Sequence, residues 1–458
     1  MSNGDDKLKR QLGLFPATNI VVANMIGAGI FTTSGLLMSG LHDPLVMIVL
    51  WVVGGIVALC GALSYSELGA AMPEAGGEYN FLSQLYHPLF GFLSGWVSFM
   101  VGFSAPIASS ALGFSEYFCR AFPGVAAGLS NAGIMSPFVT GKVLAISVIL
   151  IFTFIHYRGI KYGAKIQNVL TLLKIGLIVV LLIAGFSSGQ GNFSNIGKGS
   201  GVAHGLTGWK TMGLSLMWIM FAYSGWNAAT YIGGEIKNPS KTIPRSLLLG
   251  TGIVMLLYIG VNLLYIYGIE PQKMEGVISV GGLAMGNLFG KSADVVFSLL
   301  IAFALFSSLS AFIIIGPRVY YSMAKDGLFF KSAAKIHKKF LVPSNSILIQ
   351  ALIAIVMVVS GTFEQVLTYM GFALGIFPLL AVFGVLKMRR ENKSVIKLPG
   401  FPLPQILYML VGVMILVLSF FERPMEPSIA ALTVAIGVPA YYIFKRKNGV
   451  PAETKEQS

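Results

Sequence analysis

The chain is poor in charged residues and in cysteine. Only 11% of its 458 residues are charged, and it contains two cysteines and five histidines. Because a typical soluble domain is about 25% charged, this composition argues against an ordinary soluble protein. Cys60 and Cys119 are too few to build a disulfide framework or a cysteine-rich metal site, and we expect neither a metal nor another cofactor.

Clusters of reactive side chains are also missing. His156 is predicted at a helix end, and the other four histidines fall in predicted loops. Membrane enzymes usually gather histidines, carboxylates or an activated nucleophile around one site. The sequence also has no glycine-rich phosphate loop that ends in lysine and serine or threonine. We therefore predict that the protein is not an enzyme and that ATP does not drive it directly.

Long apolar runs fill most of the chain. Hydrophobic residues make up 55% of the sequence, and the mean hydropathy is +0.77. A helix of about 20 apolar residues spans a bilayer. Runs of this kind occupy residues 13–37, 45–71, 88–119, 139–158, 165–187, 208–235, 244–269, 289–324, 346–361, 363–388, 402–421 and 427–445. The sequence therefore predicts an all-α membrane protein in which residues 1–458 form one domain of twelve transmembrane helices.

Positive charge is distributed unevenly between the two sides of the predicted membrane. The formal net charge is +14, from 32 lysine and arginine residues against 18 acidic ones. If the N-terminus lies inside, the basic residues on the outer side are Arg120, Lys142, Lys198, Lys210, Lys273, Lys291 and Arg423. Cytoplasmic loops carry such an excess of basic residues, so both termini are predicted to be cytoplasmic in a cell membrane. The charge indicates topology, and we expect no nucleic-acid partner.

Two of the apolar runs are interrupted at corresponding places. The run 13–37 is broken at Ile26-Gly27-Ala28-Gly29-Ile30-Phe31, and the run 208–235 at Phe221-Ala222-Tyr223-Ser224-Gly225-Trp226-Asn227. Backbone groups released inside a membrane must bind another partner, because no water is present there. Matching interruptions in two halves, here 13–187 and 208–388, are typical of the substrate site of a secondary transporter. The sequence therefore predicts a transporter of a small solute.

The interruptions suit a zwitterionic ligand. Gly27 and Gly29 let a carboxylate approach backbone amides at the positive end of the second half-helix, and carbonyl groups that end the first half-helices suit an ammonium group. For one glycine motif alone, a packing notch between helices is the better interpretation, but the pairing of two breaks favours a site for an α-amino acid. The predicted substrate-binding residues are Asn24, Ile26, Gly27, Ala28, Gly29, Ile30, Phe221, Ala222, Ser224, Gly225 and Asn227, with Met25 supplying a further carbonyl.

A lysine lies near the middle of the run 165–187. Lys174 has no carboxylate one helical turn away and lies too deep to reach an interface. Charge inside a membrane is costly and indicates function. We expect the Lys174 ammonium group to donate to freed backbone carbonyls, or the side chain to be held neutral by desolvation.

Several motifs resemble those of the amino acid–polyamine–organocation superfamily. The segment from Lys9 to Leu14 (Lys-Arg-Gln-Leu-Gly-Leu) with the first break resembles its first helix, and the second break resembles the sixth helix of L-type amino acid transporters. Further similar motifs are Tyr65-Ser66-Glu67-Leu68-Gly69, Met72-Pro73-Glu74-Ala75-Gly76-Gly77-Glu78-Tyr79, Glu235-Ile236-Lys237-Asn238-Pro239, Ile243-Pro244-Arg245 and Leu398-Pro399-Gly400-Phe401-Pro402. Over residues 8–445 the resemblance implies a leucine-transporter-like fold. In that fold helices one to five and six to ten form an inverted repeat, and two peripheral helices, here 402–445, follow.

The resemblance also implies roles for single residues. The aromatic at Phe221 gates the pocket from outside, and Asn227 touches the substrate. We further expect Trp226 to pack behind Phe221; the alternative is that Phe221 is an ordinary core aromatic. Ser224 stands where relatives can have glycine, and no carboxylate is predicted at the pocket centre, so small neutral side chains are expected. In sodium-coupled proteins of this fold an ion bridges helix one to helix eight. Lys174 is predicted to replace that ion beside Ser307, Ser308 and Ser310; the rival interpretation keeps a sodium ion at these serines.

Together these observations predict a sodium-independent exchanger of small neutral L-amino acids such as alanine, serine and threonine. Proton-coupled symport is the alternative, and whether Lys174 stays charged decides between them. An amino-acid-sensing receptor or a channel on the same scaffold is less favoured, because the sequence shows no polar ring along a pore. The expected partners are the amino acid and the lipid bilayer, with no obligatory protein partner.

Overall fold

The computed structural model describes residues 12–74, 76–125, 136–158, 160–337 and 342–447, together with Arg10 and Phe340; for residues 160–166 it describes the backbone alone. Lys9, Gln11 and Ala75, which belong to the motifs above, lie outside the described residues.

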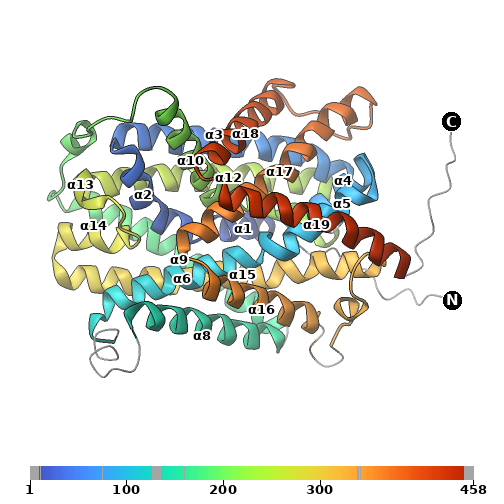
Figure 1. Cartoon of the computed structure of the whole chain (residues 1–458), viewed down its shortest axis with the longest axis horizontal. Coiled ribbons are helices and arrows are strands. Elements are labelled where there is room, and N and C mark those ends of the chain that lie inside the picture. The colour runs from blue at the N-terminus through green and yellow to red at the C-terminus, as the bar shows by residue number, and fades with distance from the viewer. Residues whose placement is uncertain are drawn as a thin grey trace.

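The described chain is almost entirely helical (Figure 1). Its first half contains α1 (Leu14–Met25), α2 (Ala28–Leu41), α3 (Pro44–Ala71), α4 (Glu78–Leu85), α5 (Pro88–Val97), the π-helical turn η1 (Ser98–Gly102), α6 (Ser104–Ala121), α8 (Pro137–Tyr157) and α9 (Ile160–Ser187). Its second half contains α10 (Gly205–Ala222), α11 (Ala228–Tyr231), α12 (Pro239–Gly268), α13 (Pro271–Met274), α14 (Val280–Phe289), α15 (Lys291–Lys325), α16 (Ser344–Ser360), α17 (Phe363–Arg390), α18 (Leu403–Glu422) and α19 (Met425–Lys447).

Ten helical segments of the described chain are long and apolar enough to cross a membrane, and all ten coincide with predicted runs. The remaining two runs, 208–235 and 346–361, correspond to the broken pair α10–α11 and to the 17-residue α16. The prediction of an all-helical membrane protein is thus confirmed, and the count of twelve spans stays a prediction. The structure adds the short apolar helix α14, which the sequence analysis did not identify and which packs along α15.

Local sequence signals set the helix boundaries. α3 begins where the Asp43 side chain accepts a hydrogen bond from the Val46 amide, with proline at the first helical position. α17 begins at a capping box, in which Thr362 and Gln365 each bind the backbone amide of the other.

The two predicted breaks are present and face each other. α1 ends at Met25 and α2 begins at Ala28, while α10 ends at Ala222 and α11 begins at Ala228. A Cβ atom on Gly29 would lie 2.6 Å from the Ala222 side chain. Gly225 has φ +95°, and a Cβ atom there would lie 2.8 Å from the Asn24 carbonyl carbon. Glycine is therefore required at both positions, since it permits the close approach and the left-handed backbone.

Neighbouring helices enclose the breaks. α12 packs along α1 and α3, and α15 packs along α6, α9 and α14. In Figure 1, α4 and the C-terminal end of α19 lie at the right-hand end of the molecule, and α13 and α14 at the left-hand end. By the charge distribution of the sequence, the end with α4 is the predicted inner end and the end with α14 the predicted outer end.

Candidate functional site

Two adjoining cavities lie beside the breaks. The larger cavity is on the side toward α4, and the smaller one is at the start of α2. The larger has a volume of about 110 Å³ and is lined by Asn24, Glu78, Ser98, Gly102, Phe103, Met220, Phe221, Ser224, Gly225, Trp226, Asn227, Ala228, Tyr231, Phe312, Ile315, Gly371, Leu374, Gly375, Pro378 and Tyr408. The smaller, of about 10 Å³, is lined by Asn24, Met25, Gly27, Ala28, Gly29, Pro106, Ser109, Ser110, Phe221, Ala222, Ser224 and Phe312. The residues that line both are Asn24, Phe221, Ser224 and Phe312. A ligand bound at the breaks would therefore extend from the smaller cavity into the larger.

Most of the predicted substrate-binding residues line these cavities. Those that do are Asn24, Gly27, Ala28, Gly29, Phe221, Ala222, Ser224, Gly225 and Asn227. Ile26 and Ile30 line neither cavity and are fully buried. The backbone carbonyls of these two isoleucines are instead used inside the protein, where Ile26 accepts from Lys174 and Ile30 from Tyr265.

The start of α2 can bind an anion. Gly27 precedes the first helical residue, and no side chain caps this helix end. The first amides of a helix have no partner within the helix, so the amides of Ala28, Gly29 and Ile30 are available to an anion at the positive end of the helix dipole. A Cβ atom on Gly27 would meet its nearest neighbour, Ser308 Oγ, only at 3.8 Å, so space remains beside these amides.

The predicted carbonyl ligands for an ammonium group are mostly occupied. The Tyr258 hydroxyl lies 2.6 Å from the Met25 carbonyl oxygen and 2.9 Å from that of Ala222. The Phe221 carbonyl accepts from the Ser224 amide. The carbonyls expected to bind the ammonium group are those of Asn24, Met25, Ile26, Phe221 and Ala222. Among them, only the Asn24 carbonyl receives no hydrogen bond from the described residues, so it is the one still available to a ligand.

Tyr258 of α12 is a residue that the sequence analysis missed. It is fully buried and ties the end of α1 to the end of α10. A signal was present, because Tyr258, Asn262 and Tyr265 share one helical face. Asn262 accepts from Ser34 at 2.5 Å, and Tyr265 lies 3.4 Å from the Ile30 carbonyl oxygen, so this face binds both halves of the broken first helix.

Lys174 reaches the first break, as expected. Its Nζ atom donates to the Ala23 carbonyl at 3.1 Å, to the Ile26 carbonyl, and to Ser308 Oγ at 3.1 Å. Ser308 Oγ in turn donates to the Ile26 carbonyl at 2.8 Å. The side chain is 1% exposed and forms no ion pair within the described part of the chain. One ammonium group thus connects α1, α9 and α15.

The other two serines of the predicted coupling site lie elsewhere. Ser307 Oγ lies 3.2 Å from Gln167 Nε2 and 3.3 Å from Thr171 Oγ1, and Ser310 pairs with His156. Ser307 thus faces α9 at a different position from Lys174, and Ser308 is the serine of the three that contacts the lysine. The role of Ser307 in coupling stays a prediction.

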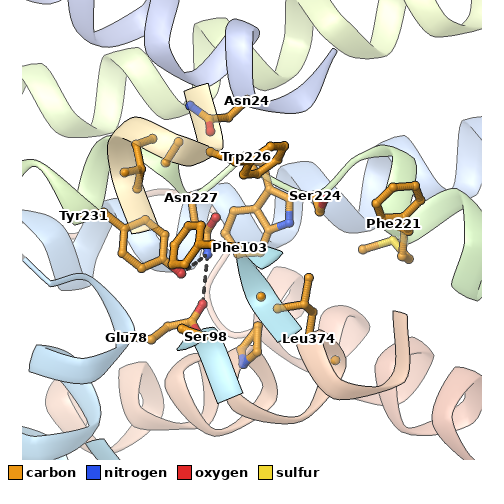
Figure 2. Close-up of a pocket in the computed structure, with 18 of the residues that line it drawn as sticks. Asn24, Glu78, Ser98, Phe103, Phe221, Ser224, Trp226, Asn227, Tyr231 and Leu374 are labelled. Carbon is orange, nitrogen blue, oxygen red and sulfur yellow. Dashed lines mark hydrogen bonds between the residues drawn. The ribbon is translucent and has the colours of Figure 1, made fainter. Parts of the chain in front are cut away.

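Phe221 and Trp226 lie on different walls. Phe221 lines both cavities, at the junction between them. The Trp226 ring packs against Tyr65, with ring centroids 4.7 Å apart, and against Tyr408, and Figure 2 shows it apart from Phe221. In this conformation Trp226 does not pack directly behind Phe221, and the gating roles stay predictions.

A carboxylate lines the wall of the larger cavity. The sequence analysis predicted only that none lies at the pocket centre, and that expectation stays a prediction. Glu78, at the first position of α4, is 5% exposed, and its Oε1 atom accepts from Tyr65 at 2.7 Å and from Asn227 Nδ2 at 2.9 Å. Burial raises the pKa of the Glu78 carboxyl group, and the hydrogen bonds from Tyr65 and Asn227 oppose this shift. The sequence analysis treated Glu78 only as part of a motif, because a loop between two helices gives no sign that it folds back against the break.

Comparison with known proteins gives matches along nearly the whole chain. Residues 12–440 match the family description "Amino acid permease". The chain is 28% identical to the b(0,+)-type amino acid transporter 1 of Mus musculus over 95% of this chain and 88% of that protein. It is 27% identical to the serine/threonine exchanger SteT of Bacillus subtilis (strain 168) over 98% of this chain and 99% of that protein. It is also 26% identical to the large neutral amino acids transporter small subunit 2 of Mus musculus, over 96% of this chain and 82% of that protein.

Proposed function

This chain belongs to the amino acid permease family, and we propose that it is a sodium-independent secondary transporter that exchanges small neutral L-amino acids such as alanine, serine and threonine. In this proposal the amino acid binds across the two breaks, and the protein exposes the site alternately to each side of the membrane.

The contact of Lys174 with the first break carries the proposal of sodium independence. The ammonium group supplies a positive charge to two carbonyls of α1 and to a hydroxyl of α15. Carbonyl and hydroxyl oxygens are also the groups that bind small hard cations. A lysine already bound to them occupies their lone pairs and makes a second cation unfavourable by charge repulsion.

Two observations support a small neutral substrate. The uncapped amides at Ala28 and Gly29 suit the carboxylate, and the smaller cavity beside them has little room for a side chain. Ser224 lines both cavities and reduces their volume relative to glycine. One relative is named as a serine/threonine exchanger and another as a transporter of large neutral amino acids, and the limited space favours the first class of substrate here.

The proposal includes an architecture for the membrane. Twelve transmembrane helices form a five-plus-five inverted repeat, with 13–187 and 208–388 as the two halves and 402–445 as two peripheral helices. Both termini lie in the cytoplasm. In this proposal the protein works as a single chain without an obligatory protein partner.

Counterflow in proteoliposomes tests the proposal. Vesicles loaded with unlabelled alanine should accumulate external labelled alanine in buffer without sodium and without a proton gradient. Serine and threonine should compete, whereas N-acetylated or carboxy-amidated alanine should not, because each modification removes one of the charged termini. Uptake that requires a sodium gradient would indicate that a sodium ion binds at Ser307 and Ser308, and it would contradict the proposal.

Proton symport is the second candidate, and the position of Glu78 favours it. A buried carboxylate at the cavity wall, with a raised pKa, can bind a proton together with the substrate. Symport predicts that an inward proton gradient drives net alanine uptake into empty vesicles. Exchange predicts that empty vesicles take up little alanine whatever the gradient.

A further inference from the structure

The side-chain amide of Asn227 forms its hydrogen bonds through its nitrogen atom. Asn227 Nδ2 donates to Glu78 Oε1 at 2.9 Å, and it lies 3.4 Å from the Tyr231 hydroxyl oxygen. Figure 2 shows both contacts on the side of the amide that faces α4. The Asn227 carbonyl oxygen points the other way, and no donor among the described residues binds it.

The carboxylate dictates this orientation. An ionised carboxylate only accepts hydrogen bonds, whereas an amide has one accepting and one donating end. With Glu78 ionised, Asn227 must therefore turn its nitrogen toward the carboxylate and its Oδ1 away from it. A flipped amide would place two acceptors against each other in a buried position, which is unfavourable.

The surroundings hold Glu78 in place. Tyr65 donates to Glu78 at 2.7 Å and is itself fully buried between Phe81 and Trp226. Gly77, with φ +54°, lies against the Tyr231 ring, where a Cβ atom would approach to 2.6 Å. The carboxylate therefore has a fixed position beside the second break.

We propose that Glu78 is a positioning residue that fixes the polarity of Asn227, so that the cavity presents a hydrogen-bond acceptor and prefers amino acids with a hydroxyl on the side chain. The inference rests on the proposed function, because it requires that an amino acid bind at the breaks with its side chain in the larger cavity. Threonine and valine are the discriminating pair, since they have nearly the same shape and differ by a hydroxyl in place of a methyl group.

The expected preference is about tenfold for threonine over valine, the effect of one hydrogen bond between uncharged groups. A neutral group at position 78 can donate as well as accept, so it permits either orientation of the Asn227 amide. The preference should then fall to about twofold or less. A role in folding alone would change the affinities for alanine, threonine and valine together.

The test is competition with labelled alanine counterflow by purified protein in proteoliposomes. The wild-type protein and the Glu78→Gln variant are compared by the ratio of the inhibition constants of valine and threonine. A ratio that collapses in Glu78→Gln, beyond any common change in the affinities for alanine, threonine and valine, supports the inference. An unchanged ratio overturns it, and so does an equal loss of affinity for all three amino acids.

A second variant covers the case in which Glu78→Gln does not fold. The double variant Glu78→Gln/Asn227→Asp reverses the pair, because the introduced glutamine can donate to the introduced aspartate and leave an acceptor facing the cavity. It should retain the preference for threonine. Loss of the preference in the double variant would mean that the carboxylate at position 78 acts itself, and would refute a positioning role. If the wild-type protein transports neither alanine nor threonine, the proposed function fails instead.

Discussion

At the scale of single residues, several fully buried polar groups join the broken helices. Lys174 was predictable, because a lone lysine near the centre of an apolar run has few alternatives to freed carbonyls. Its serine partner was not, since the choice among three serines depends on how α9 and α15 are rotated about their axes. The sequence analysis missed the roles of Glu78 and Tyr258 for a similar reason, because these roles depend on contacts between segments that are distant in the sequence.

Replacing Lys174 tests the charge at the first break. Lys174→Ala should leave the protein folded but slow exchange by about tenfold or more, because it removes three hydrogen bonds from a charged donor. The affinity for alanine should change modestly. Lys142→Ala is the matched control, since Lys142 also donates to a backbone carbonyl, that of Val359, but on the exposed surface. Equal exchange rates in the two variants would show that Lys174 has no special role.

The junction of the two cavities gives a second prediction. Phe221→Ala should reduce the exchange rate far more than the amount of protein in the membrane, because a ring at this junction can cover bound substrate by a change of rotamer. Initial rates normalised to protein abundance would show the effect. A normal rate per molecule would exclude a gating role.

At the scale of helices, the two breaks were the strongest prediction from the sequence. Glycine inside a long apolar run has an identifiable cost, and two such interruptions at the starts of two halves favour a common function over a packing accident. What the sequence did not provide was the direct contact between the breaks, because Ala222 and Asn24 carry no pattern that marks them as contacts of Gly29 and Gly225. Nor did the sequence show that Tyr258 and Lys174, which lie on other helices, occupy most of the freed carbonyls.

The hydroxyl of Tyr258 should be needed to hold the breaks together. Tyr258→Phe leaves the Met25 and Ala222 carbonyls without their shared donor and should lower the free energy of unfolding by about 1–3 kcal/mol. Tyr86→Phe is the control, since its hydroxyl donates to one carbonyl, that of Leu380, away from the site. Thermal unfolding in detergent, with and without alanine, measures both. A smaller loss for Tyr258→Phe than for Tyr86→Phe would contradict the bridge.

The glycines of the first break provide a matched pair. Gly29→Ala places a methyl group 2.6 Å from Ala222 and should destabilise the protein by about 1–3 kcal/mol. Gly27→Ala meets its nearest neighbour at 3.8 Å and should cost less. Both variants are measured by thermal unfolding without ligand. If Gly27→Ala is the more damaging of the two, the approach of α2 to α10 is not what requires glycine.

At the scale of the whole molecule, ion pairs close both ends of the helix bundle. At the predicted inner end, Arg389 of α17 binds both oxygens of Glu67 on α3. At the predicted outer end, Arg120 of α6 binds both oxygens of Asp294 on α15, at 2.7 and 2.8 Å. Only the packing of the helices shows the partners of these acidic residues. Since the larger cavity lies toward α4, we expect the outer end to be the more tightly closed of the two.

The outer pair should therefore oppose opening toward the outside. Asp294→Asn removes the charge of the pair and should increase the fraction of protein that can bind external substrate, which lowers the apparent external KM. The side chains are 25% and 21% exposed, and removal of such a partly solvated pair should change KM by about threefold. Glu270→Gln is the control. Glu270 directly precedes α13 and pairs with Lys273 inside that helix, so this exposed ion pair does not join two separate helices.

The measurement for the outer pair is alanine exchange in vesicles of uniform orientation, with the substrate concentration varied on one side at a time. Glu67→Gln should shift the internal KM in the same direction, since it weakens the inner end. A parallel change of KM on both sides in either variant would mean that the pairs stabilise the fold without controlling access.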